Sequence, residues 1–116
     1  MFGVATLPPP AAAADQRASA LQARMLAAFA ADLPARRAEL AGAVARRDQD
    51  GAAHVLHGLK GSAAHLQANE LQLLAGDLEV AADCGHWESI DAGLPRLAEL
   101  LAPFDSTATS AVPRKL

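Results

Sequence analysis

The chain has 116 residues, of which 52% are hydrophobic but only 3% are aromatic, and it contains no tyrosine. This length predicts one domain, and a core built mainly from Leu, Ala and Val favours packed helices over a β-sandwich. The formal net charge is −3, with basic and acidic residues interspersed. This pattern lacks the basic patch of a nucleic-acid-binding protein, so we expect a protein partner or a small anion.

The compartment is indicated by the single cysteine and by the lack of long apolar runs. Cys84 stands alone, which excludes an internal disulfide and agrees with a reducing compartment. No apolar run approaches the ~20 residues that span a bilayer, and the first residues lack the basic start of a signal peptide. We therefore expect a cytoplasmic protein without direct membrane contact, either free-standing or part of a larger protein.

Domain boundaries follow from composition. Residues 1–14 are rich in Pro and Ala and predict a flexible leader or linker, residues 15–104 predict the ordered domain, and residues 105–116 predict a frayed tail. Asp15 is a candidate N-cap. The first helix then carries apolar residues at helical spacing, namely Leu21, Met25, Phe29 and Leu33. Pro34 suits a first helical turn, so a second helix is predicted from there toward Arg47.

The central stretch predicts an amphipathic helix from about Asp50 to at least Leu66, after a turn that ends at Gly51. At about 100° per residue, one set of apolar side chains clusters within roughly 50° of a single direction. These core-facing residues are Ala52, Val55, Leu56, Leu59, Ala63 and Leu66. His57 points almost directly away from this stripe, onto the outer face of the helix.

Two further helices complete the predicted fold. Asn69 is a candidate cap for a helix that ends at Gly85, with apolar positions at Leu71, Leu74, Leu78 and Ala81. The last helix has apolar residues at heptad spacing, namely Trp87, Ile90, Leu94, Leu97, Leu101 and Phe104. Because Pro95 would cost ~3 kcal/mol in a regular helix, we expect a kink or two helical pieces there. The whole predicts an all-α protein: an antiparallel up-down four-helix bundle with an additional N-terminal helix.

The surroundings of His57 suggest phosphoryl chemistry. A neutral imidazole with a free ring nitrogen is a competent nucleophile toward phosphorus. Gly61 costs ~1 kcal/mol relative to alanine in mid-helix, and one turn beyond His57 it leaves room for a bulky group. Lys60 on the same side is a cation that can neutralise an anion. Ser62 lies farther round the helix, toward its core face. Its hydroxyl either adds to the His57 site or donates a hydrogen bond to a carbonyl of the preceding turn. The plain alternative is an ordinary surface histidine.

The segment from His57 to Ala63, HGLKGSA, resembles the H-x-L-K-G-S-[AS] signature of histidine phosphotransfer (HPt) domains. These are intermediate carriers in multistep bacterial and fungal phosphorelays, and the likeness extends over about residues 25–104. The resemblance implies that His57 is the phosphoacceptor, Lys60 stabilises the phosphate and Gly61 gives steric access. It also implies receiver domains as partners, with Mg²⁺ on the receiver and no intrinsic cofactor. One departure is Gln67, where family members often carry glycine.

Other candidate sites have plainer readings. His54 and His65 flank His57 and admit a metal site, but no carboxylate or thiolate is positioned to complete it, so we expect solvated histidines and no metal. Cys84 and His86 are read as helix-end or surface residues, and Trp87 as a core anchor. No nucleotide-binding fingerprint is present.

The expected partner surface surrounds the histidine. Met25 and Phe29 are either core residues or contacts for the receiver, and Ala53, His54 and Ala64 lie near His57 on the helix surface. We expect a monomeric phosphoryl carrier rather than an enzyme. The carrier is either a free-standing protein or a domain of a hybrid sensor kinase. The alternative from another class is a non-phosphorylated helical adaptor that binds its partner through the same surface.

Overall fold

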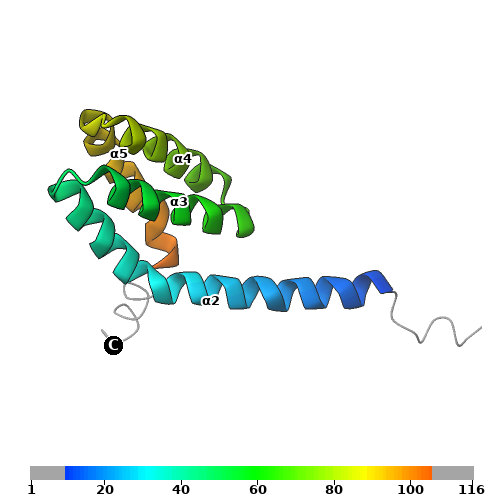
Figure 1. The fold of residues 1–116 in the computed structure, drawn as a ribbon. Coiled ribbons are helices and arrows are strands. Elements are labelled where there is room, and N and C mark those ends of the chain that lie inside the picture. Colours follow the sequence, from blue (N-terminus) through cyan, green and yellow to red (C-terminus); the bar gives the residue numbers. More distant parts are fainter. Residues whose placement is uncertain (1–9, 106–116) are drawn as a thin grey trace, which may run out of the picture.

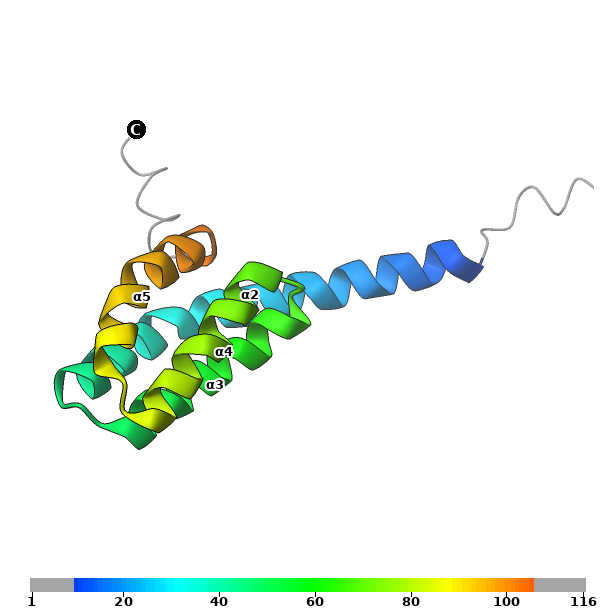
Figure 2. The same ribbon diagram turned by 90° about the horizontal axis from the view of Figure 1, so that it is seen from above.

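The computed structural model describes residues 10–105, and these form helices and no strand. The order is α2 (Pro10–Ala45), α3 (Gln49–His65), α4 (Asn69–Cys84) and α5 (Trp87–Leu101), followed by a short 3₁₀ helix, η1 (Ala102–Phe104). Turns of two or three residues join the helices, so each runs back along its predecessor, and α3 and α4 lie side by side (Figures 1 and 2). This arrangement agrees with the predicted all-α bundle.

The first helix differs from the prediction. Pro34 lies inside α2, so the expected break into two helices is wrong. A proline in a helix interior removes one backbone hydrogen bond and bends the helix instead of ending it when the flanking turns are held by packing. Figure 1 shows α2 changing direction in its cyan part, the region of the sequence that contains Pro34. From Phe29 onward α2 packs in the bundle, whereas its first turns project beyond the other helices.

The first turns of α2 lie within the predicted leader and precede the predicted cap. The helix includes residues 10–14, which the composition had assigned to the leader, and it therefore begins before the predicted cap at Asp15. Leu21, the first apolar residue of the predicted helical pattern, is 50% exposed. The remainder of the predicted leader, residues 1–9, and residues 106–116 of the predicted tail lie outside the described residues. No helix among residues 10–105 has the length and apolar character to cross a membrane.

One apolar core fills the space between α3, α4, α5 and α2 from Phe29 onward. All six residues of the predicted α3 stripe are 0–8% exposed, which confirms that pattern. Every buried side chain among the described residues is apolar. The ring of Phe29 on α2 meets that of Phe104 edge to face, with ring centres 5.5 Å apart. Truncation of a fully buried core leucine such as Leu56 would cost roughly 2–5 kcal/mol.

The helix ends differ in part from those predicted. Asp48 caps α3, because its carboxylate accepts a hydrogen bond of 3.0 Å from the amide of Gly51, which lies inside the helix. Ala68, not Asn69, occupies the N-cap position of α4, and no side chain caps that end. Pro95 lies within a continuous α5, so the alternative of two helical pieces is wrong and the kink stays a prediction.

Three turns share one backbone motif. α2, α3 and α4 are each followed by a residue in the left-handed conformation, namely Arg47 (φ 55°), Gln67 (φ 59°) and Gly85 (φ 71°). In each turn the next amide donates back to a carbonyl five residues earlier, as Ala68 does to Ala63 at 2.9 Å. This is the Schellman arrangement, in which glycine is preferred because it has no Cβ. The glycine common at position 67 in the resembling family therefore matches this backbone, and Gln67 adopts it at a cost of about 1–2 kcal/mol.

Candidate functional site

His57 lies in the middle of α3 with its side chain 70% exposed. Its Nδ1 atom lies 3.0 Å from Oε2 of Glu79 on α4. A carboxylate only accepts hydrogen bonds, so in the neutral imidazole this contact places the ring proton on Nδ1 and leaves a lone pair on Nε2. The structure therefore presents an exposed imidazole with one nitrogen held and the other available as a nucleophile.

Glu79 joins the histidine to the lysine. Its Oε1 atom lies 2.8 Å from Nζ of Lys60, and its side chain is only 17% exposed. The contact with Lys60 is the main cause that lowers the pKa of Glu79; burial opposes it, and the contact with His57 lowers the pKa by a smaller amount. Glu79 is therefore a stable carboxylate that contacts both α3 residues at once.

Gly76 gives Lys60 its path to Glu79. A Cβ atom at Gly76 would lie 3.3 Å from Cδ of Lys60, so the stem of the lysine crosses α4 where that helix has no side chain. The stem is thereby directed along α4 to the carboxylate. Two residues of α4, Gly76 and Glu79, thus determine where the predicted phosphate-stabilising cation lies.

Neither α4 residue was found from the sequence, although a signal for Glu79 exists. α3 and α4 form a hairpin about the turn at Gln67, and positions at similar distances from that turn face each other. His57 lies ten residues before Gln67 and Glu79 twelve residues after it. Counting outward from the turn reaches two carboxylates near the level of the histidine, Asp77 at ten residues and Glu79 at twelve, so it narrows the choice without selecting Glu79.

Gly61 is exposed on the outer face of α3, and a Cβ built there meets nothing within 4 Å. Packing within the protein therefore does not require glycine at this position. The open space at Gly61 agrees with the expected role in steric access, because no atom of the described residues would meet a Cβ placed there.

The opposite side of His57 faces α2. A shallow hollow of about 270 Å³ is bordered here by Arg36, Glu39, His54, Val55, His57 and Gly58. Arg36 reaches across α3 at Gly58: its Nη1 atom lies 2.6 Å from the position that a Cβ on Gly58 would occupy. No ion pair or side-chain hydrogen bond joins the Arg36 guanidinium to another residue in the described range of 10–105.

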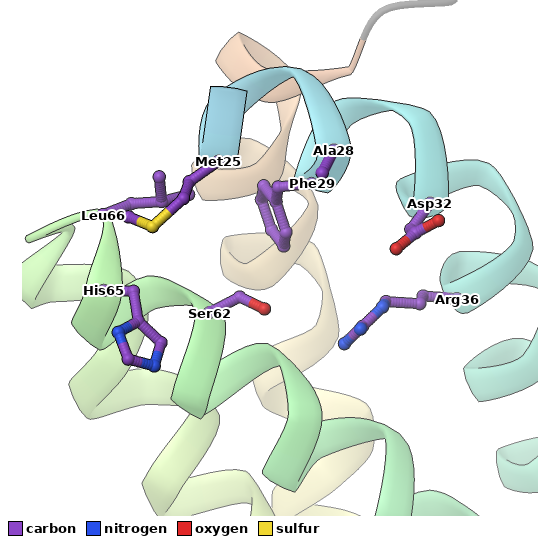
Figure 3. Close-up of a pocket in the computed structure, with 8 residues that line it drawn as sticks. All are labelled: Met25, Ala28, Phe29, Asp32, Arg36, Ser62, His65 and Leu66. Carbon is purple, nitrogen blue, oxygen red and sulfur yellow. The ribbon is translucent and has the colours of Figure 1, made fainter. Parts of the chain in front are cut away.

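A second hollow, of about 180 Å³, lies farther along the cleft between α2 and α3. Figure 3 shows its lining, with Arg36 extending from α2 toward α3 and the Ser62 hydroxyl pointing into the hollow. Ser62 thus belongs to this hollow and not to the His57 contacts. The complete lining is Met25, Ala28, Phe29, Asp32, Arg36, Ser62, His65 and Leu66.

The expected partner-binding residues fall into two groups. Phe29 is 5% exposed and belongs to the core while also lining the second hollow, whereas Met25 is half-buried on the same lining. Ala53 is half-buried, and His54 and Ala64 are exposed around His57. A partner placed over His57 would therefore meet residues of α3 directly and would reach the core through the hollow beside Met25.

The remaining candidates lie apart from this site. Cys84 is exposed at the end of α4, and His86 occupies the N-cap position of α5 without a side-chain cap bond. Trp87 is half-buried beneath Arg47, whose guanidinium lies 5.3 Å from the ring centre. Within residues 10–105, no three His, Cys, Asp or Glu side chains are grouped so as to hold a metal ion.

Comparison with known proteins identifies the family. The family model described as "Hpt domain" matches residues 24–107, which include the bundle and the His57, Lys60 and Glu79 cluster. Searches of curated proteins and of solved structures gave no match. The family match covers well over half of the chain, in agreement with the HGLKGSA signature on α3. The chain therefore belongs to the Hpt domain family.

Proposed function

We propose that this protein carries a phosphoryl group on His57, received from the phospho-aspartate of one receiver domain and passed to another. Hpt domains are phosphocarrier modules of phosphorelays, and the chain belongs to that family. The observation that carries the proposal is the contact between Nδ1 of His57 and Glu79, which leaves Nε2 free on an exposed ring.

The transfer can be written with these groups. The lone pair of Nε2 on His57 attacks phosphorus, an N–P bond forms, and the P–O bond to the aspartate breaks with its electron pair leaving on the carboxylate. The ring then carries a positive charge, which Glu79 stabilises through the Nδ1 proton. In the second transfer, a carboxylate oxygen of the next receiver attacks phosphorus and the N–P electron pair returns to Nε2.

Lys60 and Gly61 assist this transfer in different ways. Lys60 is 37% exposed and close enough to His57 to share Glu79, so its ammonium can reach a phosphoryl group on the ring. Gly61 leaves the approach from outside free of side-chain atoms. The receiver's Mg²⁺ would neutralise the charge on the phosphoryl group during transfer. We place the receiver over α3 and the edge of α2, with Ala53, His54 and Ala64 around the histidine and Met25 beside the hollow.

The direct test uses phosphoramidate, a small donor that transfers its phosphoryl group with loss of ammonia and needs no cognate receiver. All four histidines of the chain are exposed in the structure, so they provide an internal comparison. We expect one acid-labile phosphate on Nε2 of His57, seen by ³¹P NMR and mass spectrometry, and its loss in His57→Gln. His54→Gln is the matched control and should react as the parent does. Equal labelling of His54 and His57 would contradict the proposal.

The second part of the test uses a phosphorylated receiver with Mg²⁺. Transfer to the parent protein but not to His57→Gln is expected. If a receiver binds tightly to both proteins and neither gains phosphate, the adaptor function is correct instead. We further propose that the carrier acts as a monomer in the cytoplasm, which sedimentation of the purified chain and localisation of a tagged chain would check.

A further inference from the structure

Arg36 places a second cation beside His57, one for which the sequence pattern predicts no role. It comes from α2, on the opposite side of the histidine from Lys60, and borders the same hollow as His57 and His54. Lys60 is already paired with Glu79 at 2.8 Å. The Arg36 guanidinium has no such partner within residues 10–105. An unpaired, half-buried guanidinium beside a nucleophile is suited to an incoming anion, because arginine matches the oxygens of a phosphoryl group.

Gly58 makes this placement possible. The Nη1 atom of Arg36 lies only 2.6 Å from the position that a Cβ atom on residue 58 would occupy. Any other residue at position 58 would displace the end of the arginine side chain. Gly58 also immediately follows His57, and a glycine in mid-helix lowers stability by roughly 0.5–1 kcal/mol relative to alanine. Gly58 therefore lowers the stability of the helix, but its lack of a side chain lets Arg36 lie against α3.

We propose that Arg36, seated over Gly58, is a second phosphoryl-binding residue of the His57 site. This inference rests on the proposed function. Arg36 contacts the phosphoryl oxygens from the α2 side, while Lys60 approaches from the α4 side, so that the group on Nε2 lies between two cations carried by different helices. The two cations differ in that Lys60 is ion-paired with Glu79, whereas Arg36 has no ion pair within residues 10–105, although the acidic residues Asp32 and Glu39 line the hollows that it borders.

The test is a ³¹P NMR titration of the protein phosphorylated on His57 with phosphoramidate. A cation that contacts the phosphoryl group favours its dianion and so lowers the phosphoryl pKa. Arg36→Gln should raise the proton affinity of the phosphoryl group by about threefold to fivefold, as expected for the loss of a partly exposed charge pair. The variant should also take up phosphate from phosphoramidate more slowly, by a similar factor. Arg24→Gln is the matched control, an exposed arginine on the same helix, and should change neither quantity beyond about 1.5-fold.

Gly58→Ala gives an independent test with the arginine still present. The added methyl should displace the guanidinium, raise the phosphoryl proton affinity in the same direction as Arg36→Gln, and leave thermal stability unchanged or increased, because alanine favours the helix. The double variant should be no worse than Arg36→Gln alone.

The outcomes separate this inference from the proposed function. If His57→Gln still gains the phosphate, the proposed function fails. If only His57 is labelled but Arg36→Gln titrates as the parent does, the proposed function stands and the role of Arg36 is wrong. If Arg36→Gln leaves the titration unchanged and weakens only receiver binding, Arg36 is a docking residue and the inference is likewise overturned.

Discussion

The two sides of His57 are built in different ways. On the α4 side, Glu79 contacts His57 at 3.0 Å and Lys60 at 2.8 Å, and Gly76 leaves the lysine its path. On the α2 side, Arg36 borders an open hollow and has no ion pair with a described residue. We infer from this difference that α4 fixes the orientation and proton of the nucleophile, whereas α2 leaves charge available for the group that arrives.

The strongest test of this comparison is Glu79→Gln on the paired side. The amide keeps the shape but loses the charge that holds Nδ1 of His57, and a hydrogen bond to a charged group is worth about 1.5–3 kcal/mol. Uptake of phosphate from phosphoramidate should therefore slow by about tenfold. The same change on the open side, Glu39→Gln, should alter the rate of phosphate uptake by less than about twofold. Glu39 borders the hollow but forms no hydrogen bond or ion pair with His57. Equal effects of the two variants would contradict the division between the sides.

Lys60→Gln should have an intermediate effect. Because the lysine is 37% exposed, its loss should slow phosphate uptake by about threefold to fivefold. The contact with Lys60 is also the main cause of the lowered pKa of Glu79, so this pKa should rise in the variant. Initial rates and a ¹³C NMR titration of the Glu79 carboxyl group measure the two effects. An unchanged pKa of Glu79 would show that the ion pair is absent in solution.

Gln67→Gly tests the turn that sets α3 against α4. The left-handed backbone at φ 59° favours glycine, and part of that gain is offset by the greater freedom of glycine in the unfolded chain. The free energy of unfolding should increase by about 0.5–1 kcal/mol in urea denaturation. Phosphate uptake should stay at the parent rate, because the turn lies away from His57. A slower rate would mean that the turn also adjusts the register of His57 and Glu79.

The smallest effect is expected in the pH dependence of stability. The pKa of Glu79 is lowered in the folded state, so its contribution to stability is present above the ordinary carboxyl value of 4.5 and is lost as pH falls through the lower folded value. Below about pH 4.5, the free energy of unfolding of the parent should therefore fall more steeply than that of Glu79→Gln. Urea denaturation between neutral pH and about pH 3 measures both slopes. Parallel slopes would exclude a lowered pKa.

The sequence determined the features that depend on position along a single helix. The α3 stripe of six buried apolar residues, the outward direction of His57 and the place of Lys60 beside it all follow from the helical period of 3.6 residues. The signature around His57 likewise identified the family, because it occupies one continuous segment.

Only the tertiary structure decided the features that join two helices. Glu79, Gly76 and the seating of Arg36 over Gly58 depend on the register between α3 and its two neighbours, which no pattern within one helix specifies. The continuity of α2 through Pro34 was likewise settled by packing of the bundle, which outweighed the local preference of proline to begin a helix. The nucleophile was thus encoded locally, whereas the groups that orient it, and the cation proposed to meet its ligand, are brought to it by helix packing.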